Sequence, residues 1–441
     1  MVCCLSAGTM WSQTETASPG ATAPEMPARR MLTLADAKRQ AFERNWDLLA
    51  AQSDVDIATA QKIVAREFPN PTLSFSTAQI SVDNHAASTP AGNDLWQRSY
   101  DTIVAVNQLF EIGGKRSNRR ASAVAGLKAA EARLMDARRT LDLAVTKSYV
   151  AALLAETNFL ILRQSSASLR KEAKIAEARL NAGDISRADK SQIEIAAERL
   201  EMDAAAAVAA AKNARISVEV LLGVNKPTGD WAPGDSLDSL AIPPSLATER
   251  TSGAFLFPPA RPDLLAAEAV RQKAEADYKY QKALRIPDPT LLVQYEHEPP
   301  DMPNTIGIGV SFPLPLWNHN RGNIHAADIA RQQADLQLAK TKANIIAEIA
   351  TAETTYADAS ARFTHQRDFI QPKSEDVRKT ISFAYEKGGA SLLDLLLAER
   401  NDNDVRLATA QAAAEAANAA AALKAATYVS ERENSKPNVR K

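Results

Sequence analysis

Cysteine, aromatic residues, glycine and net charge are all scarce in this sequence, and each scarcity excludes a class of protein. Only the adjacent Cys3 and Cys4 occur among 441 residues, which leaves no cysteine for a metal cage or a redox pair. An aromatic content of 5% with 16 glycines argues against an all-β or α/β enzyme and favours long helices with small side chains. A formal net charge of −1 gives no polybasic surface for nucleic acid, so we expect no nucleic-acid partner.

The N-terminal segment has neither the basic start nor the apolar run of a secretory signal. Residues 1–31 are therefore interpreted as the remainder of a leader followed by a disordered spacer rich in Thr, Ala and Pro. Cys3 and Cys4 belong to a processed leader or include a lipid-acceptor cysteine, and both interpretations stay open. No segment approaches the roughly 20 apolar residues of a membrane-spanning helix, so a membrane protein would have to be a β-barrel.

An internal duplication organises the rest of the chain. Three segments reappear in the same order: Phe68–Leu73 as Ile286–Leu291, Asp47–Gln52 as Asp263–Glu268, and Gly183–Ser186 as Gly388–Ser391. Such ordered matches indicate two copies of one structural unit. We assign residues 32–222 to the first repeat, 223–261 to a linker, 262–429 to the second repeat and 430–441 to a disordered tail.

Each repeat is predicted to run helix, strand, strand, helix, helix. The opening helices end where proline forbids continuation, and the first begins after Thr33, an N-cap residue followed by Asp36. The predicted helices are 34–66, 119–180 and 186–222 in the first repeat, and 262–284, 323–387 (interrupted at Pro372) and 391–428 in the second. The predicted strands are 72–82 and 99–110, then 290–296 and 305–314.

The last predicted strand alternates strictly between apolar and small or polar residues. Its apolar members are Ile306, Ile308, Val310, Phe312 and Leu314. In a membrane barrel the apolar face contacts lipid and the other face lines a water-filled lumen. Four strands cannot close a barrel, so the chain must oligomerise, and three copies give about twelve strands.

Three segments resemble the TolC-type outer-membrane efflux proteins: Leu32–Ala37, Phe110–Arg116 and Pro313–Gly322. The resemblance extends from about Leu32 to about Val429. Within the family the sequence is most similar to the heavy-metal efflux, CzcC-like branch, whose members serve CzcA-like pumps.

The resemblance implies an α+β, mainly α duct: a homotrimer with a twelve-stranded barrel in the outer membrane and a periplasmic α-helical barrel. The linker 223–261, with Trp231, would contribute to an equatorial belt. Implied partners are outer-membrane lipid, a periplasmic adaptor (membrane fusion) protein and an inner-membrane pump of the resistance-nodulation-division (RND) class. The pump would supply the energy, so we expect no enzymatic activity, cofactor or bound metal in this chain.

The two turns between long helices are the candidate functional sites. The resemblance places them at the periplasmic aperture, with Asp394, Ser391 and Tyr385 at the gate. Residues expected to contact the adaptor are Arg179, Leu180, Gly183, Ser186, Asp189 and Gly388. Three copies of Asp394 would attract cations and resist closure, whereas the alternative is that Asp394 and Asp189 only complement helix dipoles.

No catalytic group of residues is evident. His297, between Glu296 and Glu298 in a predicted loop, is either a metal ligand or part of a solvated polar loop. Two alternative functions remain open: a duct of the same fold for drugs or organic solutes, and a non-transport periplasmic adaptor or scaffold. An adaptor should contain a lipoyl-like β-domain, and the segment between Pro69 and Phe110 is too poor in Gly and Val for one.

Overall fold

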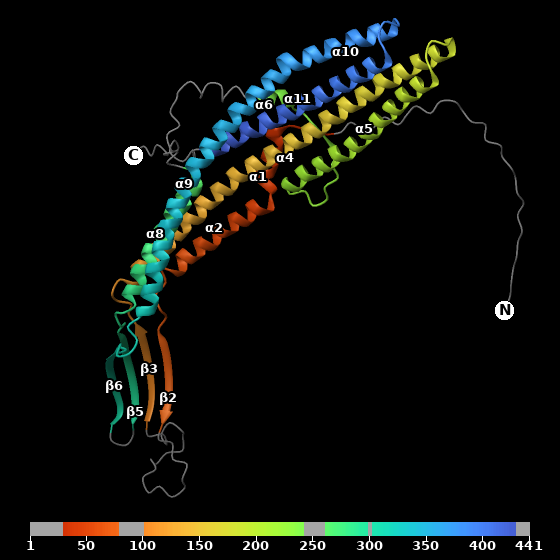
Figure 1. Ribbon diagram of the computed structural model, residues 1–441. Coiled ribbons are helices and arrows are strands. Elements are labelled where there is room, and N and C mark those ends of the chain that lie inside the picture. The colour runs from red at the N-terminus through yellow and green to blue at the C-terminus, as the bar shows by residue number, and fades with distance from the viewer. Residues whose placement is uncertain (1–29, 79–100, 242–260, 299–301, 429–441) are drawn as a thin grey trace, which may run out of the picture.

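The computed structural model describes residues 30–78, 101–241, 261–298 and 302–428. The expected N-terminal leader up to residue 29 and the C-terminal tail from 430 lie outside these residues. The described chain is elongated, with four strands at one end, long helices along its length and two helical hairpin tips at the other end (Figure 1).

The helices and strands follow the predicted order and confirm the fold class. The helices are α1 (Leu34–Arg44), α2 (Trp46–Val64), α4 (Lys115–Ala182), α5 (Arg187–Leu221), α6 (Leu237–Ala241), α8 (Pro262–Ala283), α9 (Arg321–His365), the π-helical turn η2 (Gln366–Ile370), α10 (Gln371–Glu386) and α11 (Leu392–Ala426). The strands are β1 (Arg30–Leu32), β2 (Thr72–Ala78), β3 (Asp101–Leu109), β4 (Trp231–Pro233), β5 (Thr290–Glu298) and β6 (Met302–Ser311).

The four long strands form one antiparallel sheet in the order β2-β3-β5-β6. Its register separates two kinds of side chain. One row across the sheet is Phe75, Val104, Tyr295 and Ile306, and the adjacent row on the opposite face is Ser74, Ala105, Gln294 and Gly307. The strands therefore combine an apolar face with a face of small and polar residues, as the alternation in the sequence predicts.

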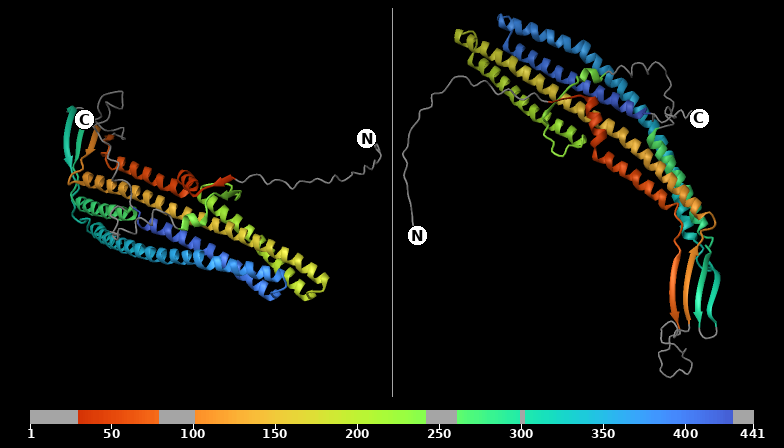
Figure 2. Two further views of the ribbon diagram at one scale, coloured as in Figure 1. Left: turned by 90° about the horizontal axis from the view of Figure 1, so that it is seen from above. Right: turned by 180° about the vertical axis from the view of Figure 1, so that it is seen from behind.

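Small side chains fill much of the helical core. Buried alanines recur along α11, from Ala410 to Ala426, and α11 contacts α4, α9 and α6. Larger buried residues such as Tyr149 and Phe363 belong to the same apolar cluster. Because alanine allows close approach of helix backbones, the long helices pack side by side along the length of the molecule, as both views of Figure 2 show.

The first predicted helix is wrong in one respect: it is two helices, α1 and α2, separated at Asn45. The Asn45 side chain accepts a hydrogen bond from the Leu48 amide and donates one to the Leu221 carbonyl at 3.0 Å. Asn45 thus caps the start of α2 and the end of α5 together, which interrupts the helix. The contact with Leu221 spans 176 residues, so the local sequence pattern does not show it.

A small equatorial layer extends the ordered chain into the expected spacer. Arg30 and Met31 were assigned to the spacer, but with Leu32 they form β1, which pairs in parallel with β4. Tyr149 of α4 supports this layer, because its hydroxyl donates to the Leu32 carbonyl at 2.8 Å and its ring stacks on Trp231. The pairing depends on a strand about 200 residues away, which explains why composition alone gave the wrong boundary.

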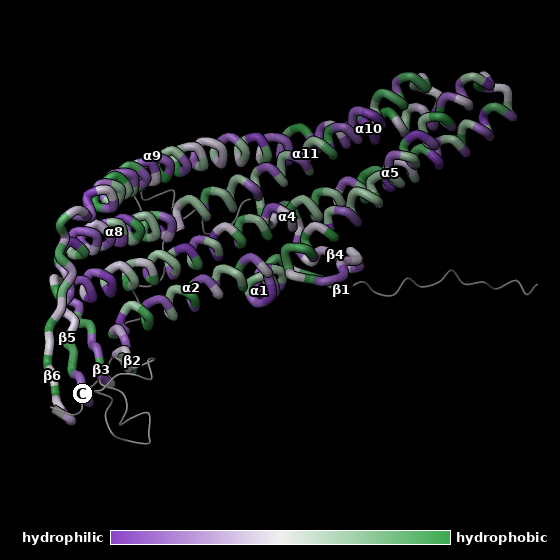
Figure 3. Tube along the Cα trace, turned by 90° about the horizontal axis from the view of Figure 1, so that it is seen from below, coloured by the Kyte–Doolittle hydropathy of each residue, from purple (hydrophilic) through white to green (hydrophobic). Residues whose placement is uncertain are grey.

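Contrary to the sequence analysis, one described helix, α4, contains a stretch long and apolar enough to cross a membrane by length and composition. A third of that stretch is buried against other elements. Hydrophilic and hydrophobic residues are interspersed along the long helices (Figure 3), and α4 contacts α2, α5, α8 and α11. These contacts identify α4 as a member of the packed helical layer.

Candidate functional site

Both hairpin tips reverse the chain through a glycine in the left-handed conformation. Gly183 has φ of 85° and Gly388 has φ of 77°. At the first tip the Gly183 amide donates to the Leu180 carbonyl and the Asp184 amide to the Arg179 carbonyl. These bonds satisfy the last carbonyls of α4, and no residue with a Cβ adopts this φ without strain.

A complete capping box follows each tip. At the second, the Asp394 amide donates to Ser391 Oγ at 3.2 Å while the Ser391 amide donates to an Asp394 carboxylate oxygen at 3.2 Å. Ser186 and Asp189 make the same pair of bonds at the start of α5. The hydrogen bonds from the Ser391 side chain and backbone hold the pKa of Asp394 below its usual value. Asp394 is thus a charged helix cap, whatever else it does.

The two hairpins contact each other close to their tips. Arg179 of the first hairpin donates to the Tyr385 carbonyl of the second at 3.2 Å, and its guanidinium lies 5.0 Å from the centre of the Tyr385 ring. Beneath this pair Ala176, Ile193 and Leu395 form a small buried cluster with Tyr385. The cluster joins the hairpin formed by α4 and α5 to the hairpin formed by α10 and α11.

The residues proposed from the sequence gather at the tips but differ in exposure. Exposed residues are Gly183, Ser186, Gly388, Ser391 and Asp394, and half-buried ones are Arg179, Leu180 and Asp189. Tyr385 differs from the expectation for a residue lining an opening, since it is only 2% exposed and lies between the hairpins. Its side chain is committed to the hairpin contact within this chain.

A family assignment follows from comparison with known proteins. The pattern of the family described as outer membrane efflux protein matches residues 38–224 and 260–427, which is most of the chain. This chain belongs to that family. It is an outer-membrane efflux channel subunit whose helices extend into the periplasm.

Individual relatives agree with this family in sequence and fold. The chain is 25% identical over 371 residues to the cobalt-zinc-cadmium resistance protein CzcC of Cupriavidus metallidurans, covering 84% of this chain and 83% of that protein. Its fold is similar to that of CusC, with a TM-score of 0.73 and 18% identity over 93% of this chain and 99% of CusC. The outer membrane protein VceC of Vibrio cholerae has a TM-score of 0.70 and 20% identity, covering 89% and 95% of the two chains.

Exposed apolar side chains at the tips of this efflux protein were not identified from the sequence. Phe383, Leu393 and Leu397 of the second hairpin are 62%, 66% and 55% exposed, and Ile195 of the first is 67% exposed. Each lies in a helix that also carries apolar residues in its buried positions, so periodicity does not distinguish the exposed apolar residues from core residues. Their exposure in a single chain suits contacts with further chains.

A buried polar layer behind the tips was also missed. Arg378 of α10 pairs with Glu399 and Asp402 of α11, at 3.4 and 3.0 Å. On the α4 side, Ser382 of α10 donates to Glu172 at 3.1 Å. Burial raises the pKa of both Glu172 and Glu399. The sequence of α10 and α11 does not distinguish these buried charged residues from solvent-exposed ones, because their partners lie on neighbouring helices.

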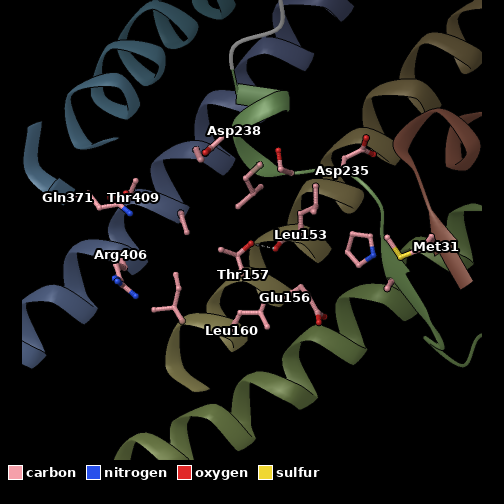
Figure 4. Close-up of a pocket in the computed structure, with 17 residues that line it drawn as sticks. Met31, Leu153, Glu156, Thr157, Leu160, Asp235, Asp238, Gln371, Arg406 and Thr409 are labelled. Atoms are coloured by element: carbon pink, nitrogen blue, oxygen red, sulfur yellow. Dashed lines mark hydrogen bonds between the residues drawn. The ribbon is translucent and has the colours of Figure 1, made fainter. Parts of the chain in front are cut away.

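A cavity of about 680 Å³ lies beneath the equatorial layer (Figure 4). Three of its charged lining residues are engaged in contacts outside the cavity. Glu156 pairs with Arg215 at 2.5 Å, Arg406 pairs with Asp402 at 3.0 Å, and Asp235 accepts a hydrogen bond from Tyr149 at 2.8 Å. The contact between Tyr149 and Asp235 holds the equatorial layer on α4, whereas the two ion pairs lie among the long helices.

The predicted loop around His297 is instead the end of strand β5, so the interpretation of His297 as a loop residue is wrong. In the register of the sheet His297 is opposite Thr102. Its Nδ1 lies within hydrogen-bond distance of the Pro303 carbonyl. Strand pairing with β3 up to His297 and with β6 at Glu298 extends β5 two residues beyond the end predicted from the local pattern.

Proposed function

We propose that this efflux protein is the exit duct of a tripartite system that exports heavy-metal cations. In this proposal it is a homotrimer that conducts passively, and an RND-class pump in the inner membrane delivers cargo through a periplasmic adaptor. The observation that carries the proposal is the two-faced sheet joined directly to very long helices. The apolar face suits outer-membrane lipid and the small, polar face suits a water-filled lumen.

The length of the helices supports a periplasmic tunnel. The helix α4 has 68 residues, which corresponds to about 100 Å at 1.5 Å per residue. Such a helix reaches far from the sheet, and its distal end carries the hairpin tips (Figure 1). A tube of this length suits a component that meets its partners well inside the periplasm.

The preference for heavy-metal cargo rests on the similarity to CzcC, which is a cobalt-zinc-cadmium resistance protein. A duct needs no metal site of its own for such cargo, because selection can occur at the pump. The alternative cargo is a drug or another organic solute carried by a duct of the same fold. Catalysis, nucleotide and cofactors have no part in the proposal.

The gate would lie at the hairpin tips. Asp394 and Ser391 are exposed there, and the negative charge of Asp394 is maintained by its own cap. Three copies around an axis would attract cations and oppose tight closure. Tyr385 would act differently, by holding its hairpin against Arg179 of the outer hairpin and so setting how far the inner helices move.

The adaptor would bind the outer surface of the same tips. The proposed contact residues Arg179, Leu180, Gly183, Ser186, Asp189 and Gly388 are exposed or half-buried. Gly183 and Gly388 have open space where a Cβ would be placed, so the tips are accessible. Exposed Ile195 adds apolar surface next to them.

A deletion strain tests cargo and function together. Cells that lack the gene are challenged with cobalt, zinc and cadmium salts and, in parallel, with a panel of organic drugs. We expect sensitivity to at least one metal, unchanged drug tolerance, and recovery when the gene is supplied on a plasmid. Drug sensitivity without metal sensitivity would establish the alternative cargo, and full resistance to both panels would contradict the efflux proposal.

A further inference from the structure

The junction between the sheet and the helices is locked where the two repeats meet inside the chain. Lys115, the first residue of α4, is 4% exposed and pairs with Asp288 at 2.7 Å. Its ammonium group also donates to the Ile286 carbonyl at 2.5 Å. Gly113 passes so close to Ile286 that an added Cβ would lie 2.6 Å from the Ile286 side chain. Gly113 and Lys115 of the first repeat therefore pack against and bind the helix-to-strand turn of the second repeat.

The same contact between repeats continues on both sides of the junction. In the sheet β3 pairs with β5, with Asn107 opposite Leu292. In the helical layer α4 packs on α8, and Ser122 of α4 donates to Asp277 of α8 at 2.5 Å. These contacts form one continuous boundary, which we call the internal seam.

The described chain has two outer edges, one formed by β2 and α2 and the other by β6 and α9. Because the chain is duplicated, each edge is the counterpart of one side of the internal seam. The helices pack in the order α2, α4, α8, α9, and the strands pair in the order β2, β3, β5, β6. On one edge β2 and α2 correspond to β5 and α8, and on the other β6 and α9 correspond to β3 and α4. Large apolar residues are exposed on both, including Phe75 at 67%, Val310 at 63% and Leu336 at 72%.

We propose that adjacent copies of this chain join these edges in the register of the internal seam. Thr72 in the first repeat corresponds to Thr290 in the second. Thr72 pairs with Asn107 and Thr290 pairs with Ser311, so Asn107 corresponds to Ser311. Leu292, the partner of Asn107, corresponds to Ser74. Ser311 therefore lies opposite Ser74 of the next subunit.

The sidedness of the sheet supports this register. Ser74 and Ser311 both belong to the face of small and polar residues, while Phe75 and Val310, the next pair, both belong to the apolar face. A shift by one residue would place the apolar face of one subunit, with Leu73 and Phe75, next to the polar face of its neighbour. The register taken from the internal seam thus continues both faces of the sheet across the subunit boundary.

The junction supplies a second, independent correspondence. Arg321 begins α9 after Asn320 in the left-handed conformation, as Lys115 begins α4 after Gly114. The turn Phe68–Pro71 corresponds to Ile286–Pro289. Arg321 is exposed and makes no hydrogen bond or ion pair with the described residues, and Phe68 is 66% exposed.

Arg321 would therefore bind the Phe68 carbonyl and the Asn70 side chain of the next subunit, as Lys115 binds Ile286 and Asp288 within the chain. One difference is informative. Asn70 stands where the internal seam has an aspartate, so the contact between subunits joins a charge to a neutral amide. A charged pair is expected to be stronger there.

Disulfide cross-linking tests the register directly. Ser74→Cys and Ser311→Cys are combined in a chain whose own cysteines are replaced (Cys3→Ser, Cys4→Ser), and isolated outer membranes are mildly oxidised. We expect most of the protein to run as dimers and trimers on a non-reducing denaturing gel and to return to monomer on reduction. Each single variant should remain monomeric on the gel.

The matched control pairs Ser76→Cys with Ser311→Cys, on the same face but two residues out of register, where side chains are about 7–8 Å apart and beyond disulfide reach. Cross-linking of this control in place of the Ser74 pair, or of neither pair in membrane-inserted protein, would overturn the proposal. The inference rests on the proposed duct only in requiring several copies. The gel does not depend on cargo, so a failed metal-resistance assay and a failed cross-link are separate results.

A charge substitution tests the junction. Asn70→Asp gives the turn the carboxylate that Asp288 supplies in the internal seam. We expect it to raise the temperature at which the oligomer dissociates in detergent, and Arg321→Gln in the same chain should abolish the increase. An equal increase with or without Arg321 would show that Arg321 does not bind this turn.

Discussion

At the residue scale, Arg261 is a fully buried cation in the helical layer with partners on three helices. It is 1% exposed, pairs with Asp263 at 3.0 Å and with Glu348, and donates to the Ala426 carbonyl at the end of α11 at 2.9 Å. One guanidinium thereby connects α8, α9 and α11. The bond to Ala426 satisfies a carbonyl at the C-terminus of α11, where the helix dipole favours a positive charge.

Replacing Arg261 should destabilise the protein strongly. Arg261→Met removes the cation, leaves the buried Ala426 carbonyl without its donor, and should cost about 1–3 kcal/mol, as is typical when a buried acceptor loses its partner. Urea unfolding in detergent, followed by circular dichroism, measures the change. Arg271→Met is the control, because its pair with Asp335 is half exposed and should contribute about 0–1 kcal/mol. Equal effects of the two changes would contradict this assignment.

The charge of Asp394 can be separated from its capping role by substitution with asparagine. Asn is also an acceptable residue near a helix start but has no charge, so Asp394→Asn should preserve the fold and lower the cation selectivity of the channel in planar bilayers. Asp189→Asn is the matched control on the outer hairpin and should change selectivity less. Unchanged selectivity in the Asp394 variant would remove this residue from the gate.

The pH dependence of this effect follows from the direction of the pKa shift. A lowered pKa in the folded state means that the stabilising charge is present above the unfolded value and is lost only as the pH falls through the folded value. The carboxylate that caps α11 should therefore stay charged between about pH 5 and 8 in a single chain. A change in cation selectivity within that range would show that close approach of the three Asp394 copies raises their pKa.

Local chemistry explains which single residues the sequence predicts well. Thr33 was expected as an N-cap, and its side chain accepts a hydrogen bond from the Asp36 amide; Ser186 and Ser391, at the predicted starts of later helices, cap them in the same way. A cap involves residues only three positions apart, so the sequence displays both partners. Asn45 and Tyr385 depend on partners in distant helices, and for that reason their roles emerge only in the folded chain.

At the element scale, the buried polar layer of α10 and α11 makes the hairpin contact sensitive to pH. Since burial raises the pKa of Glu172 and Glu399, the folded protein retains protons that the unfolded chain loses, and stability falls as the pH rises through this interval. We expect the thermal midpoint of the wild type to be higher at pH 5 than at pH 7. Combining Glu172→Gln with Glu399→Gln should reduce that difference.

Glu375→Gln is the control for this measurement. Glu375 lies on α10 as well, but it pairs with Lys379 on the surface and its pKa is lowered by that partner. Its replacement should leave the difference between pH 5 and pH 7 unchanged. If Glu375→Gln and the double variant had the same effect, the buried layer would not be its source.

Proline and periodicity account for most of the predicted elements. The opening helices end before Pro69 and Pro287, and the interruption expected at Pro372 is present as the π-helical turn η2 directly before α10. Elements fixed by distant pairing were less predictable. The short β1 has no pattern of its own and exists because β4 offers a partner edge.

At the scale of the whole molecule, the duplication explains why the chain has the architecture of a duct subunit. The two repeats place two pairs of strands side by side. The outer edge of each repeat consists of one strand and one helix, so the two edges can pair with each other in neighbouring copies. A single chain with this sheet exposes an apolar face, which membrane lipid would cover, and open strand edges, which neighbouring subunits would pair in an assembled barrel. The sequence therefore predicts the architecture well, whereas the cargo is a property of the complete efflux system.

Conductance of the purified protein in planar lipid bilayers tests the central claim most directly. A duct closed at its hairpin tips should insert from detergent and give stepwise, cation-selective currents, and Arg179→Ala should increase them by releasing Tyr385 and the inner hairpin. A protein that stays monomeric and water-soluble without detergent and produces no current would contradict the account.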